Sequence, residues 1–356
     1  MSAIGTLTDL EQRIRESFLK HRSNQLVAAE VGCAIRTVYE MRKRIEAKTG
    51  VKLDCAKPKV AERQDIHVTP PPVSGTTIAD ILSHKRKIFA DQLAHKERRR
   101  LIQVKVKRPG PFGIVVYGDP HVDDDGCDIG RLESDLAVIS RDNHMLGINI
   151  GDLTNRWTGR LMRLYANQTT TLEQARELIE WMLHGRNWLA VILGNHDLWE
   201  NGADVIKWAM KDSGSAVESH GVRMQLNFPD GAPPMRIHAR HDFPGGSQYN
   251  PTHGLAKELL WGFRDHLLLA GHRHIDHYQL IANPGEDFPS HLARVSGYKV
   301  ADDYADEHHF RENRFAPAVA FVVQPNHPVP VERLKPYWDL EAAADFVAFL
   351  RKRKTA

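Results

Sequence analysis

The sequence predicts an α/β fold preceded by a small all-α domain. From residue 111 onward, five short runs of strand-forming residues each end in Asp, His or Asn, and helical stretches separate several of these runs. Most of the runs are largely apolar, as expected for strands that are buried on both faces. Residues 9–49 show instead a pattern of short helices. The chain therefore divides into a helical N-terminal part and a larger part built on parallel strands.

Length and composition agree with a globular protein of about two domains. The chain has 356 residues, of which 42% are hydrophobic and 26% are charged. No apolar stretch approaches the ~18–20 residues that a membrane span needs, and the N-terminus lacks the apolar core of a signal peptide. Cys33, Cys55 and Cys127 do not form a disulfide framework or a CxxC zinc motif. We expect a cytoplasmic protein that has no membrane partner.

Charge is distributed unevenly along the chain. Residues 1–108 contain 23 Lys and Arg against 12 Asp and Glu, a net charge of +11, whereas residues 109–356 carry −8. Such a contrast is typical of a region that contacts nucleic acid beside an acidic region. The alternative is that the basic residues simply form a solvated surface. An acidic part rich in Asp and His also suits a metal site.

Residues 1–50 are predicted to form a helix-turn-helix domain. Ser23 can cap a helix over 24–31 that Gly32 ends, and a second helix over 36–48 ends at Gly50. The spacing resembles the helix-turn-helix domains of small DNA-binding proteins and of many phage proteins. Such a domain would contact nucleic acid through its second helix, where the candidate residues are Arg36, Thr37, Tyr39, Arg42, Lys43 and Arg44. The alternative is a helix hairpin used for packing or oligomerisation, and the oligomeric state is left open.

Residues 51–110 are predicted to be a linker followed by a basic helix. Pro70, Pro71 and Pro72 favour an extended stretch, and a helical pattern covers 77–100. This helix either follows a phosphate backbone or packs as a soluble strut. At the other end of the chain, residues 331–356 are expected to contain a docked amphipathic helix.

The five strand-like runs lead into residue types that bind metal ions. Because ligands gather beyond the carboxyl ends of strands in α/β sheets, these side chains are expected to surround one point. Carboxylates, an amide and imidazoles suit Mn, Fe or Zn, and a shared carboxylate could hold two ions roughly 3.5–4 Å apart. The candidate metal ligands are Asp119, His121, Asp152, Asn195, His241, His272 and His274.

Taken in order, Asp-x-His, Gly-Asp, Gly-Asn-His-Asp, a lone His and Gly-His-x-His resemble the signature of the calcineurin-like metallophosphoesterases. The resemblance covers about residues 111–325, so a phosphoesterase domain is expected over 111–330. It implies a four-layer α/β/β/α sandwich that holds two divalent ions, foremost Mn, with Fe, Zn, Ni or Mg as alternatives. It assigns Asp119, His121 and His274 to one ion, Asn195, His241 and His272 to the other, and Asp152 to both.

The resemblance also implies catalytic roles. A bridging hydroxide would attack phosphorus, and His196 would be the general acid that protonates the leaving oxygen. Asp152 or Asp197 would orient the His196 imidazole. For the lone histidine, His241 is preferred over His238, because the strand pattern places the two on opposite faces.

Substrate contacts are predicted next to the second block. Here Gly-Asp leads into Leu-Thr-Asn155-Arg156, which departs from the phosphoprotein phosphatases of the family and favours its nucleases and small-molecule phosphodiesterases. Asn155, Arg156 and Arg160 are candidates for binding a substrate phosphate; the alternative is a capped helix start with surface arginines. The acidic run at 123–125 is interpreted as a solvated loop, because the residues around it do not fit an EF-hand.

Two classes of function remain open. The leading hypothesis is a metal-dependent phosphoesterase that cleaves phosphodiester bonds in nucleic acid, and its enzymatic alternatives are a phosphomonoesterase and a cyclic-nucleotide phosphodiesterase. The other class is a DNA-binding or scaffold protein whose metal site is structural. His196 argues against this last reading, because a structural site does not need a general acid.

Overall fold

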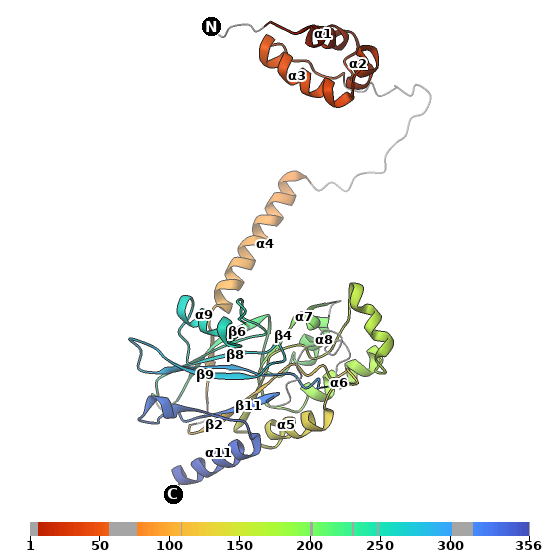
Figure 1. Ribbon diagram of the computed structural model, residues 1–356. Coiled ribbons are helices and arrows are strands. Elements are labelled where there is room, and N and C mark those ends of the chain that lie inside the picture. Colours follow the sequence, from red (N-terminus) through yellow and green to blue (C-terminus); the bar gives the residue numbers. More distant parts are fainter. Residues whose placement is uncertain are drawn as a thin grey trace. The chain divides into compact units, whose positions relative to one another are not determined.

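The computed structural model describes residues 6–56, 77–107, 109–199, 202–229, 231–247, 249–300 and 316–355. The chain forms two compact units, Met1–Ile78 and Ala79–Ala356 (Figure 1). The prolines of the predicted linker lie outside the described residues.

The first unit is a cluster of three helices: α1 (Asp9–His21), α2 (Asn24–Val31) and α3 (Ile35–Thr49). Gly32 and Gly50 end α2 and α3 in the left-handed conformation, with φ of 74° and 70°. Ser23 stands at the start of α2, but its side chain makes no capping hydrogen bond, so that detail of the prediction is corrected. The helices share a small apolar core made of Ile14, Phe18, Val27, Ala28, Val38, Ile45 and Leu53.

The second unit contains two six-stranded sheets. The first sheet has the order β1-β6-β7-β8-β10-β9 and comprises β1 (Ile102–Lys105), β6 (Gly221–Asn227), β7 (Met235–Arg240), β8 (Leu267–Ala270), β9 (His277–Ala282) and β10 (Pro289–Arg294). The second sheet has the order β12-β11-β2-β3-β4-β5 and comprises β2 (Phe112–Tyr117), β3 (Met145–Asn149), β4 (Trp188–Leu193), β5 (Ala216–Ser219), β11 (Ala318–Val323) and β12 (Leu334–Tyr337).

The strands that lead into the predicted metal ligands pair with parallel neighbours. In the second sheet, β2, β3, β4 and β5 run parallel, so their carboxyl ends lie at one edge. In the first sheet, β7 is parallel to β8. Both sheets are mixed. In the second sheet β11 is antiparallel to β12 and β2, and in the first sheet β6 is antiparallel to β7 and β9 to β10.

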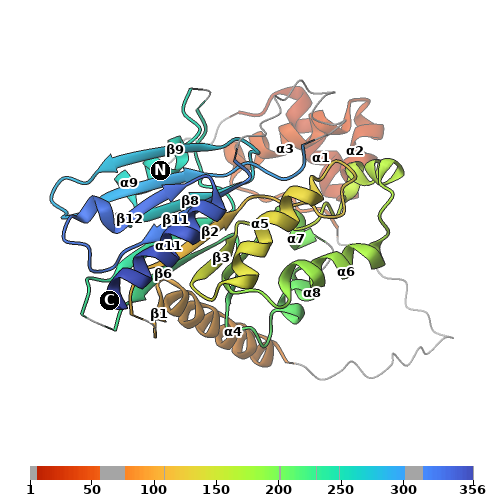
Figure 2. The ribbon, with the colours of Figure 1, turned by 90° about the horizontal axis from the view of Figure 1, so that it is seen from below.

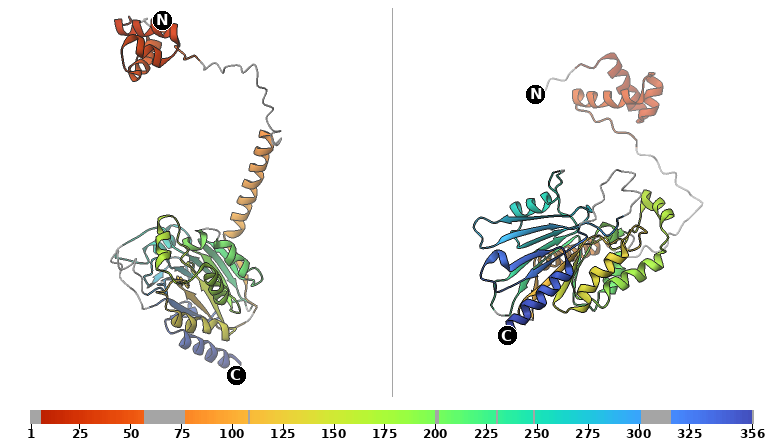
Figure 3. Two further views of the ribbon diagram at one scale, coloured as in Figure 1. Left: turned by 90° about the vertical axis from the view of Figure 1, so that its right-hand side faces the viewer. Right: turned by 60° about the horizontal axis from the view of Figure 1, so that its bottom comes forward.

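The core of this unit follows from the alternation of side chains along β2. Ile114 and Val116 pack with Ile237 of β7 in one apolar cluster, which joins the two sheets face to face. Val115 and Tyr117 point the other way and pack against helices. Figures 2 and 3 show α5 and α11 on that outer face of the second sheet.

The helices of the second unit are α4 (Ile78–Arg99, whose first residue belongs to the first unit), α5 (Ile129–Arg141), α6 (Leu172–Leu183), α7 (Asn195–Leu198), α8 (Gly202–Ala209), α9 (His253–Trp261) and α11 (Leu340–Thr355), with 3₁₀ segments η1 (Gly159–Asn167) and η3 (Pro330–Arg333). The expected C-terminal helix packs as predicted: Leu340 and Val347 of α11 are buried against the second sheet. Among the described helices, none combines the length and the apolar character needed to cross a membrane.

One sequence expectation changes. The region up to residue 110 was expected to contain only linker and helix, but Ile102–Lys105 forms β1, which pairs with β6 in parallel. This strand pairs with residues more than 100 positions later, so no local pattern announces it. The five ligand-bearing runs become strands as predicted, with β2, β3 and β4 in the second sheet and β7 and β8 in the first.

Candidate metal centre

The predicted metal ligands lie at the carboxyl ends of five strands and form two groups. Asp119, His121 and His274 make the first cluster, and Asp152, His241 and His272 make the second. Within each cluster, one potential ligand atom from each residue lies within 4.8 Å of the others. The structure therefore brings together six of the seven predicted ligands. The seventh, Asn195, joins the second cluster through its contact with His241.

The second cluster converges on the Nε2 atom of His241. This atom lies 3.0 Å from Asn195 Oδ1, 3.0 Å from His272 Nδ1 and 3.2 Å from Asp152 Oδ2. The other ring nitrogen, Nδ1, donates to the carbonyl of Ile150 at 2.9 Å. A backbone acceptor at Nδ1 is the usual partner of a histidine that binds metal through Nε2. Ligand atoms ~2.1 Å from one ion are about 3.0–3.5 Å apart, so these spacings fit a bound ion.

The first cluster contains polar atoms that lack a partner. Asp119 is wholly buried, and its Oδ2 accepts from the backbone N–H of His272 at 2.7 Å and lies 3.4 Å from His274 Nε2. Among the described residues, Asp119 Oδ1 and His121 Nδ1 are buried without a hydrogen-bond partner. Since a buried polar atom without a partner is costly, both are accounted for by a cation that they would bind.

Backbone conformation sets these residues apart. His121, Asp152, His272 and His274 all have positive φ, between 45° and 69°. A non-glycine residue in this region costs of order 1–3 kcal/mol, and such residues gather at functional sites. Gly194 permits the close approach of two strand ends: a Cβ there would lie 2.6 Å from the backbone nitrogen of Asp152.

The electrostatics of the centre favour a cation. Burial alone would lower the pKa of His241, but Asp119 and Asp152 outweigh it and raise that pKa to about 10. Burial would likewise raise the pKa of Asp152, yet the hydrogen bond and charge of His241 hold it well below its ordinary value. Two buried carboxylates thus attract positive charge to the point where the imidazoles meet. The donor set, its spacing and its partnerless atoms all fit divalent metal ions.

His196 lies beside both clusters. Its Nδ1 donates to the backbone carbonyl of Asn155, and its Nε2 lies 3.9 Å from Asp152 Oδ2. Its ring centroid is 5.1 Å from that of His121 and 4.3 Å from that of Trp199, and Trp157 packs edge-on at 5.2 Å. The ring is therefore held in one orientation, with Nε2 available to the centre.

Two predicted roles need correction. Asp197 was expected to be able to orient the His196 imidazole, but its carboxylate accepts the backbone N–H groups of Asp152, Leu153 and Gly194 at 2.7–2.9 Å. It holds the turn that carries Asp152. Burial and the nearby charge of Asp152 raise the pKa of Asp197 to about 7. Sequence reasoning could not separate these roles, because His196 and Asp197 are adjacent and either contact is sterically conceivable.

Asn155 was expected to contact a substrate phosphate, but it is wholly buried. Its amide group donates to Asp124 Oδ2 at 2.6 Å and to Gln168 Oε1 at 3.3 Å, and its carbonyl orients His196. Arg156 is half-buried, so its contact with substrate stays a prediction. The side chain of Arg160 lies outside the described residues.

The acidic run at 123–125 is not a simple solvated loop, as was expected. Asp123 is buried and accepts from the backbone N–H of Asn155 at 2.8 Å and from Gln168 Nε2 at 3.1 Å. Burial raises the pKa of this carboxyl group. Exposed Asp125 accepts from Thr169, whose segment leads into α6. The run therefore anchors the segment that carries Asn155.

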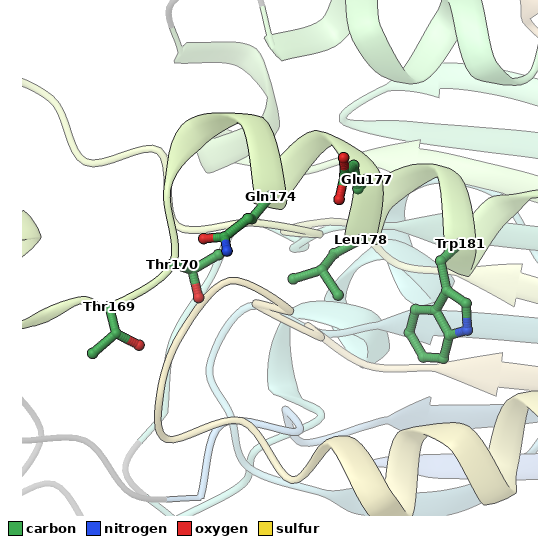
Figure 4. Close-up of a pocket in the computed structure, with 6 residues that line it drawn as sticks. All are labelled: Thr169, Thr170, Gln174, Glu177, Leu178 and Trp181. Carbon is green, nitrogen blue, oxygen red and sulfur yellow. The ribbon is translucent and has the colours of Figure 1, made fainter.

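A cavity of about 460 Å³ lies along α6 (Figure 4). Its lining comes from α6 and from the residues that precede it: Thr169, Thr170, Gln174, Glu177, Leu178 and Trp181. None of the metal-ligand candidates lines it. In the loop after β7, Tyr249 is 95% exposed.

The candidate nucleic-acid contacts on α3 fall into two groups. Arg36, Lys43 and Arg44 are exposed, and Thr37 is half-buried. Arg42 is different: its guanidinium lies 4.3 Å from the centre of the Phe18 ring and donates to Asn24 Oδ1 at 3.0 Å and to the carbonyl of Leu53. With its side chain 14% exposed, Arg42 holds the unit together, so its predicted role in DNA contact is corrected.

No protein-family model and no curated protein matches this sequence. Among solved structures, Vps29 of Chaetomium thermophilum is similar at 13% identity, covering 64% of this chain and 92% of its own length with a TM-score of 0.33. Vps29 of Entamoeba histolytica complexed with zinc is similar at 11% identity, covering 64% and 97% with a TM-score of 0.32. The NAD nucleotidase of Haemophilus influenzae is similar at 9% identity, covering 64% and 49% with a TM-score of 0.34. Because these identities and TM-scores are low, a function for this chain has to be argued from its own residues.

Proposed function

We propose that this protein is a dinuclear-metal phosphoesterase of the calcineurin-like superfamily that hydrolyses phosphodiester bonds, with nucleic acid as its substrate. The convergence of Asp152, Asn195, His241 and His272 carries the proposal, since ligand atoms of the other three residues lie 3.0–3.2 Å from His241 Nε2. The first cluster is linked to the second through Asp119, whose carboxylate accepts from the backbone N–H of His272. Mn²⁺ is the foremost candidate, because oxygen and imidazole ligands suit it.

Divalent ions in these two clusters would neutralise phosphate charge and lower the pKa of a water molecule, which supplies the nucleophile. Asp152 would lie between the ions, because it contacts a ligand of each cluster. Its Oδ2 faces His241, and its backbone carbonyl accepts from the N–H of His121. The chain's own residues determine how each ion is held. His241 is fixed through Ile150, and Asp119 is fixed through His272.

His196 would protonate the leaving oxygen. With Nδ1 bonded to the Asn155 carbonyl, the ring carries its transferable proton at Nε2, on the side of Asp152. Trp199 and Trp157 pack against the ring and restrict both its rotation and the access of water. A site that only stabilised the fold would not need an oriented imidazole beside the metal ligands.

The nucleic-acid substrate is supported by charge and by exposed cations. Residues 1–108 carry a net charge of +11, and Arg36, Lys43 and Arg44 of α3 face solvent. Lysine and arginine that neutralise phosphates make binding fall with salt. Deleting residues 1–78 should leave hydrolysis of a small diester intact, while DNA affinity falls and its salt dependence flattens. Retained DNA affinity would show that this unit is not the anchor.

The decisive experiment is Mn²⁺-dependent cleavage of end-labelled single- and double-stranded DNA, with His196→Ala in parallel. Cleavage by the wild-type protein that is lost in the variant supports a nuclease, and the product ladder gives the polarity. If DNA is untouched but bis-p-nitrophenyl phosphate or p-nitrophenyl phosphate is hydrolysed, the enzyme is a phosphoesterase with another substrate. If none of the three is hydrolysed with any of the candidate metals, the catalytic proposal fails.

A further inference from the structure

A buried guanidinium lies behind the metal ligands. Arg294, at the end of β10, has a side chain with no exposed surface. Its three nitrogens donate to three separate segments: Nε to the carbonyl of Pro251 at 2.9 Å, Nη1 to the carbonyl of Gly271, and Nη2 to Asp242 Oδ1 at 2.8 Å. A planar guanidinium can satisfy several acceptors at fixed angles, which an ammonium group cannot do.

Two of these segments carry metal ligands. Gly271 directly precedes His272, and Asp242 directly follows His241. The backbone N–H of Gly271 also donates to the carbonyl of His241 at 3.0 Å. Arg294, Asp242 and Gly271 therefore close a ring of contacts around the backbone of His241 and His272, the residues whose imidazoles meet at 3.0 Å.

A second arginine completes the arrangement. Arg273, which lies between His272 and His274, donates to the other carboxylate oxygen of Asp242 at 3.2 Å and to the carbonyl of Gly245 at 3.3 Å. Asp242 is thus held by one arginine on each oxygen. These contacts are made at Gly271 and Arg273, next to strained residues: His272 and His274 have φ of 69° and 50°. Such conformations persist only where the surroundings fix them.

We propose that Arg294, Asp242 and Arg273 form a positioning network that holds His241 and His272 at metal-binding distance. This inference rests on the proposed metal centre but not on the identity of the substrate. The described hydrogen bonds of the network go to backbone carbonyls and between its own side chains, so it acts on the metal ligands through the backbone. Its loss would loosen the second cluster, while His121 of the first cluster, which follows β2, would keep its position.

The test compares metal binding in variants that keep the core filled. In Arg294→Met/Asp242→Leu, buried Arg294 and its partly exposed partner Asp242 are replaced together by apolar side chains, an exchange that ion pairs in protein interiors often tolerate. Arg223→Met is the matched control: Arg223 makes a two-nitrogen contact with buried Asp265 at 2.6 and 2.8 Å, in the same sheet, and Asp265 keeps Arg236 as a partner. Arg294→Lys is a milder variant that retains the positive charge but loses the planar guanidinium with its three donating nitrogens.

Mn²⁺ binding to metal-free protein is measured by isothermal titration calorimetry. We expect the double variant to lose ~10–100-fold in affinity at one of two sites, as for outer partners of metal ligands, while Arg223→Met binds as the wild type does. Hydrogen–deuterium exchange of the metal-free protein should rise in the peptides covering 238–246 and 269–276 of the variant.

Unchanged affinity and unchanged exchange in the double variant would overturn the network. If that variant does not fold, Arg294→Lys decides: a weakened second site supports the network, and wild-type affinity overturns it. Failure of the proposed function would give a different result: wild-type protein would bind its metal but show no turnover.

Discussion

The imidazole of His196 donates its Nδ1 proton to the backbone carbonyl of Asn155, a residue 41 positions earlier in the chain. This contact leaves Nε2 as the atom that faces Asp152 and the metal ligands. A backbone carbonyl has no ionisable state of its own, so the group that orients the ring directly does not titrate. The segment that supplies the carbonyl is held in turn by Asp123 and Gln168.

His196→Ala should reduce turnover by ~10²–10⁴-fold, as expected for loss of a general acid, and should leave metal binding unchanged. The loss should be greatest with poor leaving groups, because they need a proton most. Steady-state rates on aryl phosphodiesters of graded leaving-group pKa measure this. An equal loss across the series would argue against the acid role.

Asp152→Asn should abolish turnover and weaken metal binding. The amide keeps the size of the side chain but removes the negative charge beside His241 Nε2, 3.2 Å away. Calorimetric titration with Mn²⁺ and an assay on a small diester measure the two effects. The matched control is Asp125→Asn, at an exposed carboxylate whose contacts are with Thr169. Equal activity in both variants would contradict the dinuclear assignment.

Gly194→Ala should damage the metal centre although the backbone of Gly194 is ordinary, with φ of −78°. The added methyl group would meet the carboxylate of Asp152 and come within 2.6 Å of its backbone nitrogen, so the turn must move. We expect Mn²⁺ affinity to fall by ~10-fold or more, by analogy with changes that displace a ligand.

Gly214→Ala is the comparison for this prediction. Its φ is 70° and nothing lies within 4 Å of the added atom, so the change costs of order 1 kcal/mol in stability through backbone strain. Metal affinity should be that of the wild type. If both glycine variants bind Mn²⁺ equally, the close approach of β3 and β4 is not what shapes the site.

Arg42→Met should destabilise the N-terminal unit by about 2 kcal/mol, because a nearly buried guanidinium loses its hydrogen bonds to Asn24 and Leu53. Arg44→Met, at an exposed position of the same helix, should leave stability unchanged and weaken DNA binding. Urea unfolding of residues 1–78, followed by circular dichroism, gives the first quantity, and fluorescence anisotropy with labelled DNA gives the second. The opposite pattern would restore Arg42 as a contact residue.

Stability should fall in mild acid, and His266 should account for part of the fall. Burial, then the charges of Arg236 and Arg333, lower its pKa to about 3, against the opposing effect of Asp265; His291 is a further neighbour. Its Nδ1 accepts from the backbone of Arg236 at 3.2 Å, and its ring stacks on Phe288 at 3.7 Å. The unfolded chain therefore binds this proton more readily than the folded one.

Protonation of His266 therefore destabilises the folded protein. Stability from neutral His266 is complete above pH ~6.5 and is lost as the pH falls towards 3, by about 2 kcal/mol at pH 5 for one such group. His266→Asn keeps an acceptor and removes the titration, so its unfolding midpoints in urea at pH 7.5 and pH 5 should differ less than those of the wild type. His84→Asn, on exposed α4, should keep the wild-type difference.

The sequence was most informative where strand and ligand are neighbours. Each of the five runs identifies its strand and the ligand that follows, because burial and metal chemistry both act on adjacent residues. Asp119, Asp152 and Asn195 follow β2, β3 and β4 within a few positions. The order of these motifs also indicated the likeness to metallophosphoesterases, which remains the basis of the proposed activity.

Features that depend on distant partners were not predicted. β1 pairs with β6, Asp197 holds the turn of Asp152, and Arg42 packs on Phe18. Arg294 contacts residues 23, 43 and 52 positions away, and nothing in its neighbourhood distinguishes it from a surface arginine. In each case the residue type was compatible with the observed role, but the partner could be identified only from the folded structure.

The division of the ligands between two sheets has a consequence for biosynthesis. Asp119, His121, Asp152 and Asn195 leave the ribosome before β7 and β8 exist, so an early fragment would lack His274 of the first cluster and both histidines of the second. The sheet that carries β2 also needs β11, which follows every ligand in the chain. Metal capture should therefore be a late event, and a nascent chain stalled before residue 318 should be unable to load its ions in the finished geometry.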